Sequence, residues 1–157
     1  MAEKKKLEKA AFDYFIKSYN LFNGTNFQFN KHSDKPDFIA EDDGQMLGVE
    51  VTHLFYDDNE AKILLGRADK RISGIMKADE LIKTLNIKLA DKVEQAAKYD
   101  FKNRMILVIR VASPVFDKSD FDREENSIKV PQSVFSEIWM LFYDTNTQSW
   151  SDLKQLK

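Results

Sequence analysis

The sequence predicts an α/β fold in which helices flank a central mixed sheet, within one domain over residues 1–157. Residues 3–22 have helical periodicity, and residues 26–54 alternate like three successive strands. Residues 105–113 form an apolar, β-branched run of strand length. A chain of 157 residues is also long enough to bury one hydrophobic core.

The composition is that of a globular protein, with 43% hydrophobic and 32% charged residues. The absence of cysteine excludes disulfides, thiol nucleophiles and cysteine-ligated metal sites. A net charge of −2 gives no overall basic field, so nucleic-acid binding would need a local patch. No apolar run reaches the roughly 18 residues of a membrane span, and Asp13 and Lys17 interrupt the first apolar segment. We therefore expect a cytoplasmic protein without a membrane segment.

The first predicted helix covers residues 3–22 and ends at the Asn-Gly-Thr sequence of residues 23–25. A short strand over residues 26–30 and a loop over residues 31–36 follow. The helix is expected to place one apolar stripe on the sheet. That stripe consists of Leu7, Ala11, Tyr14, Phe15, Ser18 and Phe22.

Two strands, over residues 36–41 and 45–54, flank the sequence Asp42-Asp43-Gly44. An Asp-Gly pair favours a tight hairpin turn, so these strands should be antiparallel neighbours. Together with the strand before them they form a three-strand meander.

The second half of the chain alternates helical and extended patterns. The expected elements are a helical region over 57–77 interrupted by Gly66 and Gly74, one long helix over 79–99, a buried central strand over 105–113, a polar loop over 117–129, a short helix from Pro131, and a strand over 138–144. The sequence leaves the structure of residues 145–157 open.

Two acidic residues could form a metal site on the hairpin. Side chains alternate along a strand, so Glu50 and Thr52 should share one face and His53 the other, with Gly48 leaving room beside Glu50. Asp37 begins the preceding strand, which lies about 5 Å away. Two carboxylates placed there could hold Mg²⁺ or Mn²⁺, hard cations that take oxygen ligands. The alternative is that both are ordinary surface acids.

The long helix carries a polar stripe made of Lys88, Lys92, Gln95 and Tyr99, which are spaced by four, three and four residues. This stripe borders the apolar face of the helix, so a lysine there could direct its ammonium group toward the two carboxylates. Lys92 is the preferred catalytic candidate and Lys88 the second, although either could be a solvated lysine. Gln95 and Thr52 are candidate substrate contacts, and Tyr99 is expected to pack the helix end against the sheet.

The sequence Pro36-Asp37-Phe38, the hairpin, and Gly48-Val-Glu50-Val-Thr52 together resemble the PD-(D/E)xK phosphodiesterase superfamily, which has the restriction-endonuclease-like fold. The resemblance covers most of the chain and implies an α-β-β-β-α-β core. It also implies a Mg²⁺-dependent nuclease in which Asp37 and Glu50 bind the metal. This chain has Thr52 where the superfamily pattern has lysine. Some branches carry that lysine on the following helix, where Lys92 or Lys88 could serve, and Gln95 and Tyr99 resemble a helical QxxxY element.

The resemblance leads to an expected endonuclease acting on DNA. A catalytically inactive module of the same fold, binding nucleic acid or a protein partner, is the alternative. A third possibility is a small interaction or immunity protein with an unrelated α/β fold, and the sequence leaves open whether the chain forms a homodimer. Glu3 and Glu8 are expected on the surface of the first helix, and His32 and His53 lack the spacing of a metal-binding pair.

Overall fold

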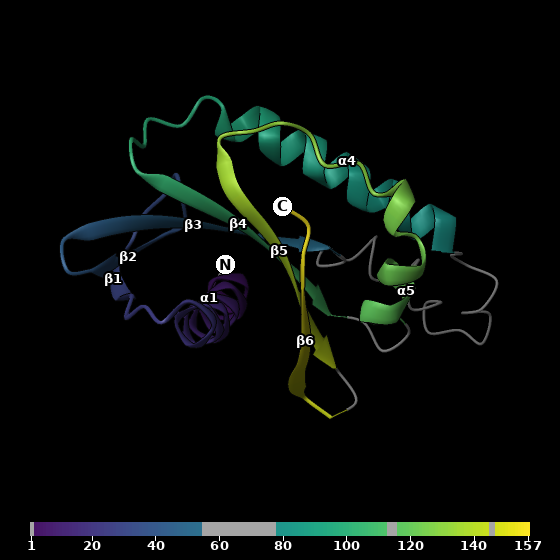
Figure 1. Ribbon diagram of the computed structural model, residues 1–157, viewed down its shortest axis with the longest axis horizontal. Helices are drawn as coiled ribbons and strands as arrows, with labels where there is room; N and C mark the ends of the chain where they lie inside the picture. The colour runs from purple at the N-terminus through teal and green to yellow at the C-terminus, as the bar shows by residue number, and fades with distance from the viewer. Residues whose placement is uncertain (1, 55–77, 113–115, 145–146) are drawn as a thin grey trace.

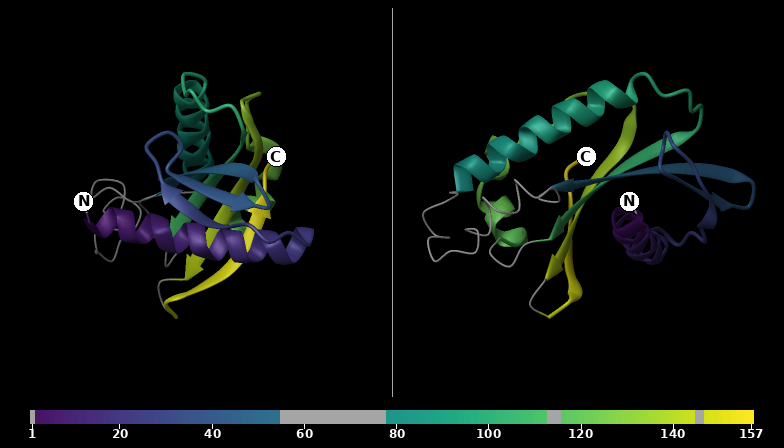
Figure 2. Two further views of the ribbon diagram at one scale, coloured as in Figure 1. Left: turned by 90° about the vertical axis from the view of Figure 1, so that its left-hand side faces the viewer. Right: turned by 180° about the vertical axis from the view of Figure 1, so that it is seen from behind.

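A computed structural model describes residues 2–54, 78–112, 116–144 and 147–157. It has three layers, with α1 on one face of a twisted sheet and α4 and α5 on the other (Figures 1 and 2). The expected α/β class with a mixed sheet is confirmed. The helical region expected over 57–77 lies outside the described residues.

Six strands of the described residues form one sheet in the order β1-β2-β3-β4-β5-β6. β1, β2 and β3 are antiparallel neighbours, β4 is parallel to both β3 and β5, and β6 is antiparallel to β5. The meander and the central position of the apolar strand are therefore as predicted. The strands are β1 Gln28–His32, β2 Phe38–Asp42, β3 Gln45–Leu54, β4 Arg104–Ala112, β5 Phe135–Asp144 and β6 Ser149–Gln155.

The hairpin between β2 and β3 turns at Asp43 and Gly44, which have φ angles of 51° and 86°. Positive φ at both central residues matches the right-handed twist of the strands, so the predicted turn is confirmed. The arms of the hairpin differ in length, because β2 has 5 residues and β3 has 10. The last paired residues are Phe38 and Val49, so β3 continues past the start of β2.

Gly48 in β3 allows a close approach that positions the start of β2. A Cβ atom at Gly48 would lie 2.6 Å from Cγ of Pro36 and 2.7 Å from Cε2 of Phe101. The space beside Glu50 that the sequence predicted is thus filled by Pro36 and Phe101. Because Pro36 precedes Asp37, this contact helps to fix Asp37 beside β3.

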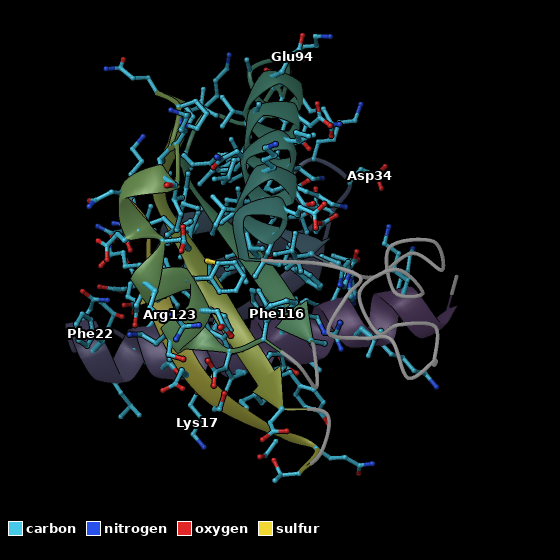
Figure 3. The ribbon with its side chains drawn as sticks, turned by 90° about the vertical axis from the view of Figure 1, so that its right-hand side faces the viewer. Lys17, Phe22, Asp34, Glu94, Phe116 and Arg123 are labelled. Carbon is cyan, nitrogen blue, oxygen red and sulfur yellow. The ribbon has the colours of Figure 1, made fainter. Side chains whose placement is uncertain are left out.

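Helix α1, Ala2–Asn23, lies on the sheet face formed by Leu47, Val49 and Val51. Its buried stripe differs from the predicted one, because Phe22 is 76% exposed at the end of the helix (Figure 3). The buried positions are spaced by one, three and four residues. They are Ala11, Phe12, Phe15, Ile16 and Tyr19.

Helix α4, Ala78–Ala96, covers the opposite face of the sheet. Leu81, Leu85 and Leu89 are fully buried against β4 and β5. The helix ends before Tyr99, because the last residues form a turn in which the amide of Tyr99 donates to the carbonyl of Ala96. The predicted long helix is confirmed, with an earlier end.

The segment expected as a polar loop contains α5, Lys118–Arg123, and a short 3₁₀ helix, Glu125–Ser127. Asp117 caps α5: its side chain accepts from the amide of Ser119, and Asp120 reaches back to the amide of Asp117. The prediction of a short helix from Pro131 is wrong, since residues 128–134 are not helical. This stretch instead leads directly into β5, which starts earlier than predicted.

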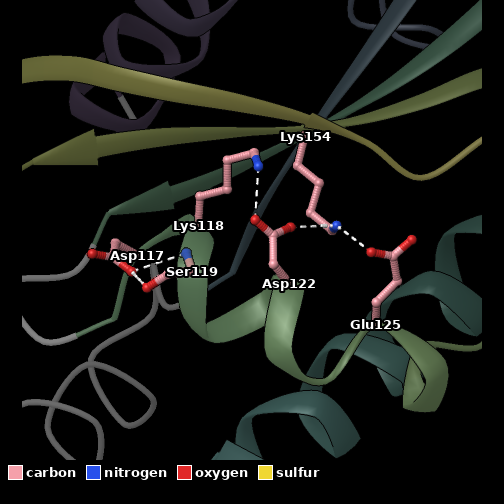
Figure 4. A network of polar contacts seen from close by, with 6 residues as sticks. All are labelled: Asp117, Lys118, Ser119, Asp122, Glu125 and Lys154. Atoms are coloured by element: carbon pink, nitrogen blue, oxygen red, sulfur yellow. Dashed lines mark hydrogen bonds and ion pairs between the residues drawn. The ribbon is translucent and has the colours of Figure 1, made fainter.

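Residues 149–155, for which the sequence predicted no structure, form β6. This strand anchors α5 through a buried lysine (Figure 4). Nζ of Lys154 lies 2.6 Å from Oδ1 of Asp122 and 3.2 Å from Oε1 of Glu125. Lys118 forms a second ion pair with Asp122, at 2.7 Å. These contacts connect the last strand to the layer that contains α4.

Candidate functional site

Glu50 lies in the middle of β3 and is 3% exposed, on the face covered by α4. Its Oε1 accepts a hydrogen bond from the backbone amide of Asp37, with a length of 3.2 Å. Its Oε2 accepts from Nζ of Lys92 at 2.9 Å and from the hydroxyl of Tyr99 at 2.8 Å. The cost of burying this carboxylate is therefore offset by one cation and two further donors.

Asp37 directly precedes β2, where the chain approaches the part of β3 that has no β2 partner. Its Oδ2 accepts from the backbone amide of Val51 at 2.9 Å, so the side chain occupies the place of a strand neighbour. Burial and the nearby charge of Glu50 raise the pKa of Asp37 to about 7, while the Val51 amide and Lys92 act in the opposite direction. Two carboxylates crowded in this way favour a shared proton or a bound cation.

Lys92 brings positive charge to the site from α4. Thr52 follows Glu50 on the same face of β3, but a threonine cannot supply that charge. The structure places Lys92 against Glu50, with 22% of its side chain exposed. Tyr99, expected to have a packing role, also donates to Glu50, and burial together with this bond raises its pKa.

The first helix adds a third carboxylate that the sequence prediction placed on the surface. Oε2 of Glu8 lies 3.4 Å from Nε2 of His53, and the Glu8 side chain is only 15% exposed. His53 points to the α1 face, as strand alternation predicts, and burial lowers its pKa. Glu8 lies three to four residues before the buried Ala11 and Phe12, and this spacing is the signal that could have identified it. The side chain of Glu3 is not among those described.

A cleft of about 240 Å³ at the open edge of β3 is bordered by Asp37, Lys92, Glu8 and His53, whereas the buried Glu50 is not one of its lining residues. Thr52 and Lys88 also line it, as part of the predicted site. Gln95 is exposed on α4 and does not line it. The lining residues are Lys4, Glu8, Asp37, Val51, Thr52, His53, Lys88 and Lys92.

The two carboxylates could bind a hard divalent cation, although two ligand residues are few for such a site. Asp37 and Glu50 could supply carboxylate oxygens from neighbouring segments of the sheet. Burial first, and the charge of Glu50 second, raise the pKa of Asp37, and a bound cation would favour its ionised form. Within the described residues, no three His, Asp or Glu side chains are grouped so as to hold a metal. A cation bound here would therefore keep several water ligands, as Mg²⁺ commonly does.

Family models, curated proteins and solved structures give no match to this chain. Among the described helices, none combines the length and apolar character needed to span a bilayer. The functional inference therefore depends on the residues of the cleft.

Proposed function

We propose that the protein is a metal-dependent phosphodiesterase that hydrolyses nucleic acid, with DNA as the expected substrate. The observation that carries the proposal is the meeting of Asp37, Glu50 and Lys92 at one open strand edge. They come from the segment before β2, from β3 and from α4, and Lys92 is 42 positions from Glu50. Acidic and basic groups at such an edge fit the needs of phosphoryl chemistry, which requires charge neutralisation and a positioned water.

The fold supports the proposal. A helix, a three-strand meander, a helix and a strand parallel to the third strand occur in this order. That order agrees with the restriction-endonuclease-like core implied by the resemblance at Pro36-Asp37 and Glu50. The resemblance also implies that both acids face one site. The hydrogen bond from the Asp37 amide to Glu50, and the bond from the Val51 amide to the Asp37 side chain, support this.

Asp37 and Glu50 would hold Mg²⁺ or Mn²⁺, which, when bound, acidifies a water ligand and neutralises charge on the phosphate. The Val51 amide fixes one oxygen of Asp37, so that carboxylate is oriented before any ligand enters. Lys92 would contact the scissile phosphate or the attacking water. Tyr99 would keep Glu50 in place when Lys92 turns toward substrate.

The proposal is tested with purified protein and linear, circular and single-stranded DNA, with Mg²⁺, with Mn²⁺ and with chelator. We expect divalent-dependent cleavage that Asp37→Asn and Glu50→Gln abolish. Isothermal titration should show Mg²⁺ binding to the wild type and to Gln95→Ala, the control, but weaker binding to Asp37→Asn. Absence of cleavage under all metal conditions, on DNA and on RNA, would reject the enzyme.

The alternative is a catalytically inactive module of the same fold that binds nucleic acid or a protein partner. One observation favours it: both oxygens of Glu50 already accept hydrogen bonds from Asp37, Lys92 and Tyr99. A carboxylate whose oxygens already accept hydrogen bonds from the protein gains less stabilisation from a bound cation. Nucleic-acid or partner binding that is unaffected by chelator, without hydrolysis, would favour this alternative.

A further inference from the structure

The side chain of Lys92 connects the cleft to the buried carboxylate behind it. Lys92 lines the cleft, with 22% of its side chain exposed, whereas Glu50 is 3% exposed and is not a lining residue. Nζ of Lys92 lies 2.9 Å from Oε2 of Glu50. Because Lys92 borders the cleft and also contacts Glu50, a cation that moved from the cleft to Oε2 would meet its ammonium group.

Asp37 differs from Glu50 because part of its carboxylate is open to a ligand. Its Oδ2 accepts a hydrogen bond from the amide of Val51 at 2.9 Å, and Oδ1 accepts none from the residues that the structure describes. Asp37 itself lines the cleft. The site therefore combines one carboxylate oxygen that a ligand can reach with one carboxylate that a cation of the protein already neutralises.

A bound cation and the ammonium group of Lys92 would compete for Glu50. Both are positively charged, and like charges beside one buried carboxylate repel each other with little screening by water. Tyr99 donates to the same oxygen at 2.8 Å, but its hydroxyl is uncharged and can stay in place. Lys92 is therefore the contact that a cation has to displace.

We propose that Lys92 controls the access of divalent cations to Glu50: its ammonium group occupies the cation position on this carboxylate, and it moves into the cleft when a cation binds to Asp37 and Glu50. This inference rests on the proposed function and adds how the metal-free site is held closed. Release of Lys92 lowers the apparent cation affinity, because only molecules in which Glu50 is accessible can bind. Lys92 thus has two positions, one on Glu50 and one in the cleft.

The first experiment measures Mg²⁺ affinity by isothermal titration for wild type and three variants: Lys92→Met, Lys92→Arg and Lys88→Met. Methionine removes the charge and keeps an unbranched side chain, whereas arginine keeps a positive charge that can pair with Glu50. Lys88 lines the same cleft from one turn earlier on α4, so Lys88→Met controls for the general loss of one positive charge. Urea unfolding without metal checks that each variant is folded.

Lys92→Met should bind Mg²⁺ about tenfold more tightly than wild type, the gain expected if roughly nine tenths of the metal-free molecules are closed. Lys92→Arg should bind no more tightly than wild type, and Lys88→Met should change less than Lys92→Met. Turnover of DNA by Lys92→Met should nevertheless fall. Metal affinity and turnover then move in opposite directions, which the loss of a purely structural lysine would not cause.

The second experiment uses the wild-type protein and so does not depend on the folding of a variant. Acetylation of each lysine by acetic anhydride is measured by mass spectrometry, with Mg²⁺ and with chelator. Lys92 should react severalfold faster with Mg²⁺, because it has lost its carboxylate partner. Lys83, which is exposed on the same helix and does not line the cleft, should react equally under both conditions.

Three results would overturn the proposal: Mg²⁺ affinity of Lys92→Met equal to or below that of wild type, an equal gain in Lys88→Met, or acetylation of Lys92 that Mg²⁺ does not change. Failure of the proposed function gives a different pattern. Tighter Mg²⁺ binding by Lys92→Met and faster acetylation of Lys92 in wild type, without cleavage of DNA or RNA, would support the role of Lys92 and reject the enzyme. If neither wild type nor Lys92→Met binds Mg²⁺, both are rejected.

Discussion

Nζ of Lys92 on α4 lies 2.9 Å from Oε2 of Glu50 on β3, although the two residues are 42 positions apart. The contact joins the helical layer to a carboxylate that is 3% exposed. It also supplies positive charge next to Thr52, where the strand itself has none. The ion pair therefore has a structural role as well as the catalytic role that we propose.

Lys92→Ala should lower turnover by about a hundredfold or more, the usual loss for a positioned electrostatic or proton-transfer group. It should also lower the free energy of unfolding by about 1–3 kcal/mol, because Glu50 loses a charged partner while buried. Steady-state kinetics and urea unfolding measure the two effects, with Lys83→Ala as control. A larger loss of turnover in Lys88→Ala would assign the catalytic role to Lys88 instead.

The stability of the metal-free protein should depend on the protonation of Asp37. Its pKa is raised from 3.8 to about 7, so the folded protein retains a proton that the unfolded chain releases at lower pH. The stabilisation is complete below pH 4 and is lost as the pH rises from about 4 to about 7. Urea unfolding across this range should show a falling free energy of unfolding in wild type and a flatter profile in Asp37→Asn. Equal slopes in the two proteins would contradict this prediction.

Gly48→Ala should destabilise the fold and disturb the site together. The added Cβ would meet Pro36 and Phe101 at less than 3 Å, and crowding of this kind costs about 1–3 kcal/mol. Displacement of Pro36 should move Asp37, so Mg²⁺ affinity should also fall in isothermal titration. The double variant Gly48→Ala/Phe101→Ala should lose less stability than the sum of the single changes. Additive losses would show that the two side chains do not compete for space.

Gly44→Val should cost on the order of 1 kcal/mol or more, because a β-branched residue is strained at φ 86°. The control is Gln45→Val, which places the same side chain one residue later on an exposed strand position. Thermal unfolding should show a lower Tm for Gly44→Val alone. Equal Tm values for Gly44→Val and Gln45→Val would mean that the turn does not require a glycine at position 44.

Asp122→Ala should destabilise the protein more than Lys154→Met, although each substitution removes two ion pairs. Lys154 is 8% exposed and Asp122 is 38% exposed, so removing the acid leaves a buried ammonium with less charge around it. That loss should be about 1–3 kcal/mol. Replacing the buried lysine with an apolar side chain of similar size should change stability by less than about 1 kcal/mol. The reverse order in urea unfolding would mean that the ion pair itself is strongly stabilising.

Local signals were sufficient to predict the hairpin and the central strand. Asp43-Gly44 has the residues that a tight turn requires, and the run from Met105 to Val111 is buried at every position. Alternation along β3 also predicted that Glu50 and His53 point to opposite faces, as their contacts with Lys92 and Glu8 show. These features depend on residues close together in the chain.

Other features depend on partners far apart in the sequence. Residues 149–155 have no strong strand pattern, and they form β6 because β5 offers a free edge. The capping of α5 by Asp117 was hidden in a polar segment that resembles a loop. The spacing of Glu8 from Ala11 and Phe12 could have indicated its burial, but not its contact with His53, which is 45 residues away.

The unequal arms of the β2–β3 hairpin have a consequence for how this protein could change. β3 pairs with β4 from Leu47 to Leu54, so the sheet does not need β2 to extend past Phe38. Residues 33–35, which precede Pro36 and Asp37, can therefore be lengthened or shortened with little effect on the sheet, while the entrance to the cleft beside Asp37 becomes narrower or wider. The same sheet could in this way admit ligands of different width. The segment before β2 would determine which ligands enter, and the pairing of β3 with β4 would maintain stability.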